Sequence, residues 1–255
     1  MNVVVLVKWV PAPAGTPEMG PDHLLVRAGV EGSLDPGDEV GLEAGLQLVE
    51  REGGELTVIS MGPPEALAAV QRALAMGAHR GVVITDDALR GADALATAKV
   101  LAAAARRQPF DLLIGGVEST DGYTGTVPAT VAELLDVPSA TFARKVDVEG
   151  AAVRIERQTE TGYDVVRGPM PILITVTAGA NEPRFPSLKG VMQAKQKPLE
   201  QLSLADLDLA PADVAAQQSV VAVQVAPAKS GGRTIGADED AATAIADLLA
   251  DAKVI

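Results

Sequence analysis

ELTVISMGPPEALAAVQRALAMGAHRGVVIT, residues 55–85, contains an apolar run, a helical pattern and a second apolar run in direct succession. The two apolar runs, Leu56–Ser60 and Gly81–Thr85, have the length and composition of strands that are buried on both faces. Between them, Leu67 and Leu74 lie two helical turns apart, with prolines before the helix and a glycine after it. A helix that joins two buried strands predicts a parallel crossover.

The same alternation continues through the rest of the first 140 residues. We expect further buried strands over Val3–Val7 and Asp111–Gly115 and a helix from about Ala92 to Arg107. Another helix should follow the sequence DPGDE, with Asp35 or Asp38 as its N-cap. The predicted fold class is α/β: a Rossmann-like, doubly wound, mostly parallel sheet with an added β-hairpin region and an extended C-terminal arm.

The pattern changes after residue 140. Alternating apolar residues on both sides of Glu149-Gly150 predict a hairpin, and Pro171–Thr177 predicts another buried strand. Farther on, the sequence predicts a short strand over residues 219–225 and a capped terminal helix. We therefore expect a domain over residues 1–200, which carries a nucleotide site and a partner-recognition loop. Residues 201–255 should form a C-terminal arm that packs on a partner subunit.

Composition excludes several classes of function. The chain has 255 residues and a formal net charge of −13, and its longest basic block is the pair Arg106-Arg107, which argues against nucleic acid as a partner. It has no cysteine, which excludes disulfides, thiolate metal sites and thiol nucleophiles. The apolar run near the start is broken by Lys8 and ended by Pro11. We expect a cytoplasmic protein without membrane insertion.

Three loops follow the predicted parallel strands, at the sheet edge where open α/β folds bind ligands. They are Lys8–Pro13, Met61–Pro63 and the Gly-, Ser- and Thr-rich stretch Gly115–Pro128. Glycines and free amides at a helix start suit a phosphate, but ordinary turns between strand and helix would look similar. No Walker or GxGxxG pattern is present. Glu118 and Asp121 fit a solvated loop better than an acid–base pair, because a glycosidase-like site would need aromatic sugar platforms.

NEPRFPSLKGVMQAKQKP, residues 181–198, is a second candidate site, which we call the docking segment. Prolines punctuate it, Phe185 and Leu188 are apolar, and Lys189, Lys195 and Lys197 follow on an otherwise acidic chain. An apolar tip flanked by cations suggests a docking element. The alternative is a connection that buries Leu188 in the domain's own core.

Several spaced motifs resemble the electron-transfer flavoprotein beta subunit. They are VKWVPAP, SLDPGDE, ALAMGAHR, DLLIGGVESTDGYTGTVPATVAELLDVP, the pair ETGYDVV and PILITV, and above all the docking segment. The resemblance runs in order from residue 1 to about 200, and the tail is also similar to the family's. It implies an electron-carrier subunit, rather than an enzyme in its own right, that pairs with an alpha subunit.

In that family the alpha subunit holds most of the FAD, and the beta subunit closes one side and binds a structural AMP. Electrons would pass from flavin dehydrogenases to a quinone-linked acceptor. Leu188 resembles the anchor that enters a pocket of those dehydrogenases. The resemblance places partner docking at Arg184, Phe185, Leu188, Lys189, Met192 and Lys195. It places AMP at Leu6, Asp35, Pro36, Gly37, Asp38, Met61, Gly116, Val117, Glu118, Ser119, Thr120, Asp121, Gly122, Tyr123, Thr124, Gly125, Thr126 and Val127.

The chain also departs from the family pattern. Relatives often carry an amide or acid at the positions of Val117, Tyr123 and Thr126, so backbone contacts to AMP are expected rather than side-chain contacts. Gln158 stands where some relatives have a hairpin acid, and no role is carried onto it. Two alternatives stay open: a stand-alone nucleotide-binding regulatory module, and a bifurcating-type subunit with a second FAD in place of AMP.

Overall fold

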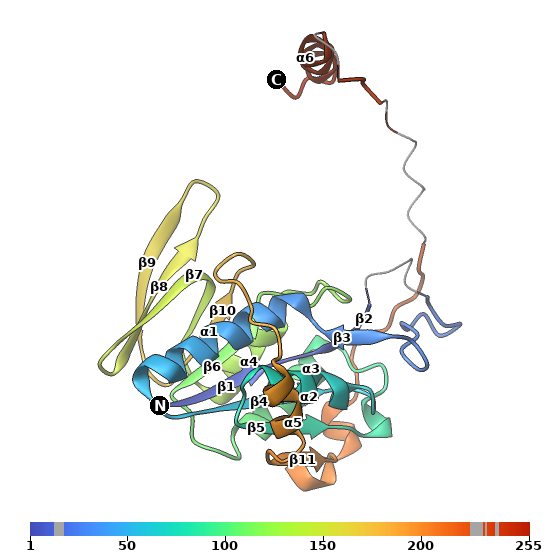
Figure 1. Cartoon of the computed structure of the whole chain (residues 1–255). Coiled ribbons are helices and arrows are strands. Elements are labelled where there is room, and N and C mark those ends of the chain that lie inside the picture. Colours follow the sequence, from blue (N-terminus) through green and yellow to red (C-terminus); the bar gives the residue numbers. More distant parts are fainter. Residues whose placement is uncertain (13–17, 225–231, 233, 238–239) are drawn as a thin grey trace. The chain divides into compact units, whose positions relative to one another are not determined.

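The structure is a computed structural model that describes residues 1–12, 18–224, 232, 234–237 and 240–255 (Figure 1). These residues divide into two compact units, Met1–Val221 and Ala222–Ile255. Pro13, at the end of the first predicted loop, and Val225, at the end of the strand predicted over 219–225, lie outside the described residues. Across the described part of the chain, no helix combines the length and apolar character needed to cross a membrane.

A nine-stranded sheet forms the centre of the first unit, in the order β11-β5-β4-β1-β6-β10-β7-β8-β9. All neighbouring pairs from β11 to β7 are parallel, and β8 and β9 continue the sheet as antiparallel strands. The strands are β1 (Asn2–Leu6), β4 (Glu55–Met61), β5 (Arg80–Ile84), β6 (Leu112–Gly116), β7 (Ser139–Glu149), β8 (Ala152–Gln158), β9 (Tyr163–Pro169), β10 (Ile172–Val176) and β11 (Leu199–Leu202).

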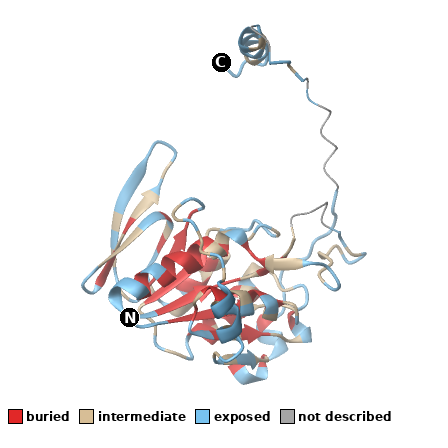
Figure 2. Cartoon of the chain, viewed as in Figure 1, coloured by how far each residue is buried: buried red, intermediate tan, exposed pale blue. Residues whose placement is uncertain are grey.

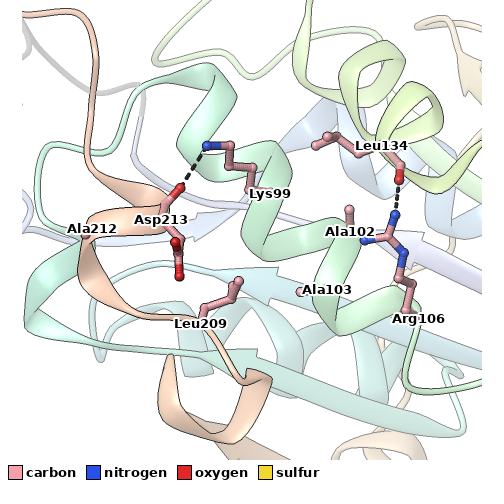
Figure 3. A pocket seen from close by; sticks show the side chains of 8 residues that line it. All are labelled: Lys99, Ala102, Ala103, Arg106, Leu134, Leu209, Ala212 and Asp213. Carbon is pink, nitrogen blue, oxygen red and sulfur yellow. Dashed lines mark hydrogen bonds between the residues drawn. The ribbon is translucent and has the colours of Figure 1, made fainter.

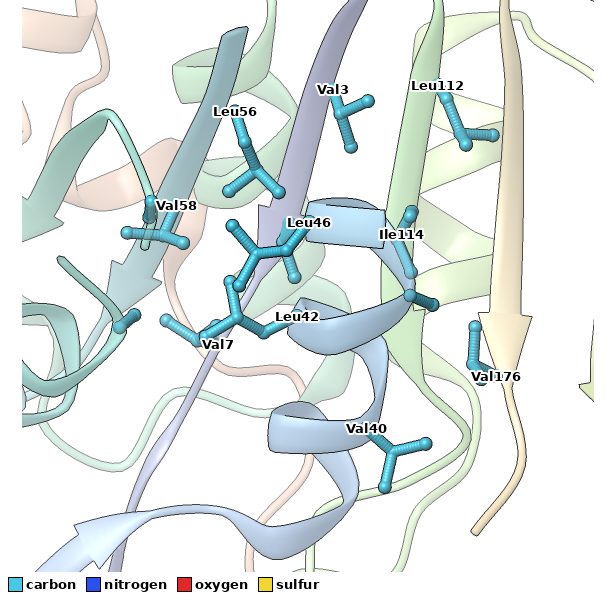
Figure 4. Packing of buried hydrophobic residues seen from close by; sticks show 14 of the residues in the cluster. Val3, Val7, Val40, Leu42, Leu46, Leu56, Val58, Leu112, Ile114 and Val176 are labelled. Atoms are coloured by element: carbon cyan, nitrogen blue, oxygen red, sulfur yellow. The ribbon is translucent and has the colours of Figure 1, made fainter. Parts of the chain in front are cut away.

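Helices cover both faces of the parallel sheet, and a separate hydrophobic cluster lies under each layer. α1 and α2 cover one face and α3 and α4 the other, and the buried residues concentrate in the central strands and α1 (Figure 2). Leu42 and Leu46 of α1 pack among Val3, Leu56 and Ile114 of the sheet (Figure 4). The helices are α1 (Pro36–Glu52), α2 (Ala66–Met76), α3 (Ala94–Ala105), α4 (Val127–Leu135), α5 (Leu188–Ala194) and α6 (Ala241–Asp251).

Shorter elements complete the first unit. A two-stranded antiparallel ribbon precedes α1 and leads the chain from β1 into that helix. Trp9, the only tryptophan of the sequence, is buried in the cluster under α1 and α2. The ribbon strands are β2 (Trp9–Pro11) and β3 (Gly32–Leu34), and the 3₁₀ helices are η1 (Asp87–Leu89), η2 (Ala205–Leu207) and η3 (Pro211–Val214).

The predicted fold class is confirmed, with element ends shifted by one to a few residues. The strand–helix–strand pattern of residues 55–85 forms β4, α2 and β5, because local periodicity determines each element. Asp35 is the N-cap of α1, and its side chain accepts from the amide of Gly37. The hairpin predicted around Glu149-Gly150 is the β7–β8 turn.

The boundary of the C-terminal arm differs from the expectation. β11 pairs with β5, and Leu204, Leu207 and Val214 are buried under α3, so residues 201–221 belong to the first unit. Residues 219–224 form no strand, since a strand needs a hydrogen-bonded neighbour and they pair with none among the described residues. α6 forms as predicted, but Asp240 at its N-cap makes no side-chain capping bond.

Two glycines of α1 test how closely this helix lies on the sheet. A Cβ at Gly45 would lie 2.8 Å from Leu56 Cδ1 and 3.2 Å from Val5 Cγ2, whereas a Cβ at Gly41 would lie 3.5 Å from its nearest neighbours. Gly45→Ala should therefore lower the melting temperature, because an overpacking cost of about 1–3 kcal/mol exceeds a helix-propensity gain of about 0.5–1 kcal/mol. Gly41→Ala should raise it. Calorimetry on both variants checks this, and equal stabilisation of the two would contradict the close contact at Gly45.

Candidate functional site

The sheet edge formed by the ends of β1 and β6 carries the predicted nucleotide loops. β4 and β5 extend the sheet on one side of β1, and β6 begins the other side, so β1 and β6 flank a topological switch point. Open α/β sheets bind ligands at such points. Leu6 ends β1 and pairs in register with Ile59, two residues before Met61 at the end of β4. The side chain of Leu6 itself is buried, so only its backbone faces this edge.

Asp35 ties the start of α1 to the loop after β6. Its side chain is fully buried, and one carboxylate oxygen accepts from the Gly37 amide at 2.8 Å. The other oxygen accepts from both the amide and the hydroxyl of Thr120, each at 2.7 Å. The cap expected at Asp35 is thus present, although α1 begins within DPGDE, at Pro36, and not after it. The cap also holds a loop 85 residues away in sequence.

Asp38, one turn into α1, binds the ends of both flanking strands. It is buried, and its Oδ2 accepts from the Lys8 amide at 2.8 Å while its Oδ1 lies 3.3 Å from the Gly116 amide. Burial first, and then the negative charge of Asp35, raise the pKa of Asp38 to about 8. Despite their polarity, both aspartates point into the protein and hold backbone amides there.

A third carboxylate, Asp121, lies between two cations. Its side chain is 6% exposed, and it pairs with Lys8 Nζ at 2.6 Å and with the Arg27 guanidinium. Burial disfavours its charged form, but the charge and hydrogen bond of Lys8, together with Arg27, hold the pKa of Asp121 below its usual value. The interpretation of Asp121 as part of a solvated loop is wrong, because this ion triad shields it from water. An ionised, doubly paired carboxylate is also a poor proton shuttle.

The tip of the loop after β6 is open, in contrast to its base. Residues 122–126 are exposed, and Gly125 has φ +63°, in the left-handed region. Within the described residues, the amides of Thr124 and Gly125 donate to no protein acceptor. They lie just before α4, whose first amides also lack intrahelical partners. Free amides at a helix start are a favourable environment for an anion.

The structure brings most of the predicted site residues together and adds two that sequence reasoning missed. Asp35, Asp38, Gly116 and Thr120 are joined by direct hydrogen bonds. Lys8 begins the first of the three candidate loops, but its side chain was given no role there, although it directly follows the first apolar run of an acidic chain, which is a usable signal. Arg27 was not predicted at all. Arg27 lies 94 residues from its partner and carries no such signal.

The docking segment is exposed at the residues predicted to meet a partner. Phe185 is 87% exposed and Leu188 80%, so the interpretation of Leu188 as a core residue is wrong. Lys189, Met192 and Lys195 are also exposed. A groove of about 360 Å³ on this surface is lined by Leu188, Lys189, Met192, Gln193 and Gln196.

Two cations of the docking segment face the protein instead. Arg184 pairs with Glu43 and Glu50 of α1. Lys197 Nζ donates to the carbonyls of Leu74 and Ala78, at the end of α2, so it is not part of the exposed cationic flank.

A second groove, of about 430 Å³, lies between α3, α4 and η3 (Figure 3). Its two cations are both used by the backbone: Lys99 donates to the Asp213 carbonyl at 2.8 Å, and Arg106 donates to the Leu134 carbonyl. We assign these contacts to holding η3 and the end of α4 in place.

The raised pKa of Asp38 predicts a pH-dependent stability. Folded Asp38 keeps its proton until pH approaches 8, whereas the unfolded residue, with an ordinary pKa of 3.8, loses it near pH 4. The free energy of unfolding should therefore fall between pH 5 and 8 by up to about 1.4 kcal/mol per pH unit. Asp38→Asn should flatten this slope, as measured by urea unfolding at several pH values.

Asp121→Asn is the matched control for that measurement. The folded pKa of Asp121 is lowered, so its contribution is lost only as pH falls through that folded value. The variant should leave the slope above pH 5 unchanged. An unchanged slope in Asp38→Asn would show that Asp38 is ionised across this range.

Comparison with known proteins agrees with this fold and indicates one family. A family model for the electron transfer flavoprotein domain matches residues 22–207. The electron transfer flavoprotein subunit beta of Thermoanaerobacterium thermosaccharolyticum is 40% identical over 81% of this chain and 79% of its own. The protein of the same name from Mycobacterium tuberculosis is 36% identical over 100% of this chain and 99% of its own. The one from Bacillus subtilis is 37% identical over 89% of this chain and 90% of its own. The chain therefore belongs to the electron transfer flavoprotein family, as a beta subunit that serves as an electron carrier.

Proposed function

We propose that this chain pairs with an alpha subunit and that the heterodimer carries electrons from flavin dehydrogenases to a quinone-linked acceptor. The alpha subunit would hold most of an FAD, which supplies the electron-carrying chemistry when bound, and this chain would close one side. The unit Ala222–Ile255 would pack on the alpha subunit, since Ile245 and Leu248 of α6 are exposed. Names of relatives that end in "subunit beta" support the pairing.

We place a structural AMP at the loop after β6. The observation that carries this assignment is the contrast within the loop: buried Asp35 and Asp38 fix its base, while free amides at its exposed tip precede α4. Lys8 and Arg27 are already paired with Asp121, so we assign the phosphate to the backbone amides rather than to these cations. A phosphate would be bound through the backbone, as expected from Val117, Tyr123 and Thr126, which stand where relatives often carry an amide or acid.

Gly125→Val should reduce the AMP content of the purified heterodimer several-fold. Valine strongly disfavours the left-handed backbone that Gly125 adopts, and its side chain would crowd the approach of a phosphate to the loop. Nucleotides released by denaturation are identified and counted by chromatography. The matched control is Gly150→Val, which imposes similar strain on the β7–β8 turn, where φ is +65° and a Cβ would meet nothing within 4 Å.

The same chromatogram separates the alternatives. Equal AMP in both variants and wild type would show that the loop is only a turn. A second FAD per heterodimer in place of AMP would identify a bifurcating-type subunit. No nucleotide beyond the FAD of the alpha subunit would remove the nucleotide role altogether.

The exposed docking segment would meet the dehydrogenase. Leu188→Ala should leave melting temperature and flavin content near wild type, because 80% of the residue is already exposed. It should lower electron uptake from a flavin dehydrogenase about tenfold or more below saturation, since burying one leucine in a partner pocket contributes roughly 1.5–3 kcal/mol. Dye reduction coupled to the dehydrogenase measures this uptake.

Leu95→Ala, the same change on α3, serves as control and should leave uptake unchanged. If Leu188→Ala transferred electrons at the wild-type rate, the docking role of the segment would be wrong. A large drop in melting temperature would instead indicate that Leu188 packs internally in the heterodimer.

A further inference from the structure

Arg184 fastens the docking segment to α1 through most of its hydrogen-bonding capacity. Its Nε and Nη2 donate to Glu43 at 2.7 and 2.9 Å, and its Nη1 and Nη2 donate to Glu50 at 2.5 and 3.0 Å. These bonds use four of the five N–H donors of the guanidinium. The backbone amide of Arg184 adds a 3.2 Å bond to Glu43, and Asn181 Nδ2 donates to the Val40 carbonyl at 3.0 Å.

Glu43 is the buried member of this arrangement. It is 4% exposed, and although burial disfavours its charged form, hydrogen bonds from Arg184 and from Gln47 hold the pKa of Glu43 below its usual value. Glu50 is 56% exposed, and the hydrogen bond from Arg184 lowers its pKa as well. A buried carboxylate must keep its partners, so Glu43 constrains where Arg184 can lie.

The other end of the segment is fixed independently. Ser187 caps α5 through a 3.0 Å bond from the Gly190 amide. The helix lies so close to α2 that a Cβ at Gly190 would be 2.3 Å from the Ala75 carbonyl oxygen. Lys197 then binds two carbonyls at the end of α2. Phe185 and Leu188, both strongly exposed, therefore lie between two points that the protein holds in place.

Resting on the docking role proposed above, we propose that Arg184 is a positioning residue: it presents Phe185 and Leu188 to the dehydrogenase without contacting that partner itself. Exposed apolar side chains on a loose loop would have to be ordered at the moment of docking, which weakens binding. Bonds already made to α1 order the loop in advance. The fork of Arg184 suits this role, because it engages two carboxylates in a fixed geometry.

A double-mutant cycle with Leu188 tests the proposal on the co-expressed heterodimer. The probe is a flavin dehydrogenase of the same organism that reduces the wild-type protein. Arg184→Lys, which keeps the charge but loses the fork, should raise the KM for the heterodimer about tenfold with kcat unchanged. In the Leu188→Ala background the same change should raise KM less than twofold, because the anchor to be positioned is gone.

Glu50→Gln provides a second variant that leaves the buried Glu43–Arg184 pair intact. Glu50 lies on α1. The Glu50→Gln variant should raise KM, as Arg184→Lys does, but by a smaller factor. In the Leu188→Ala background this increase in KM should disappear. Hydrogen exchange of the residue 184 amide, which donates to Glu43, should be faster in both variants, with flavin and nucleotide content unchanged. A merely structural role would lower the melting temperature and leave KM alone.

The outcomes separate the proposal from the function on which it rests. In one outcome, the KM of the double variant rises by the product of the two factors measured for Arg184→Lys and Leu188→Ala alone. That result would mean that Arg184 contacts the partner directly, which overturns the positioning role and leaves docking intact. A Leu188→Ala variant with wild-type KM would overturn the docking role and the positioning role together.

Discussion

Two buried carboxyl groups at the start of α1 constrain the whole candidate site. Asp35 and Asp38 are removed from water, so each needs hydrogen-bond donors inside the protein. The donors are amides at the start of α1 itself, after β1, at the end of β6 and in the following loop. Since all of them must converge on one helix start, the base of the loop after β6 has little freedom, whereas its tip at residues 122–126 is exposed.

The same helix also determines where the docking segment lies. α1 carries Asp35 and Asp38 at its N-terminal end, and Glu43 and Glu50 one to three turns farther on, where they bind Arg184. Its buried side packs on β1, β4 and β6, the centre of the sheet. A close-packed helix of 17 residues does not bend easily, so the two proposed sites hold a fixed distance along one rigid element.

Local sequence patterns predicted the helices and strands, but they could not predict which residues far apart in the sequence contact each other. The β4–α2–β5 unit follows from periodicity within 31 residues, and Asp35 is a cap of the helix that begins next to it. Asp121 and Lys8 are 113 residues apart, and Glu43 and Arg184 are 141 apart, so no local pattern links them. Residues 219–224 show that a local pattern can also predict too much. Their sequence is typical of a strand, but no strand forms because they have no neighbouring strand to bond to among the described residues.

Residues of the docking segment fall into two groups: those that bind the rest of the protein and those that are exposed to solvent. The sequence motif groups Arg184 with Phe185, Leu188 and the lysines, but Arg184 binds inward while Phe185 and Leu188 face solvent. Lys189 and Lys195 remain outward on a chain with a net charge of −13. Exposed charges at the rim of an interface act mainly on the rate of encounter, and a buried apolar anchor acts on the lifetime of the complex. In the docking proposed above, Leu188 and the two outward lysines would act at different steps of the encounter, and Arg184 would serve both by fixing the surface on which they lie.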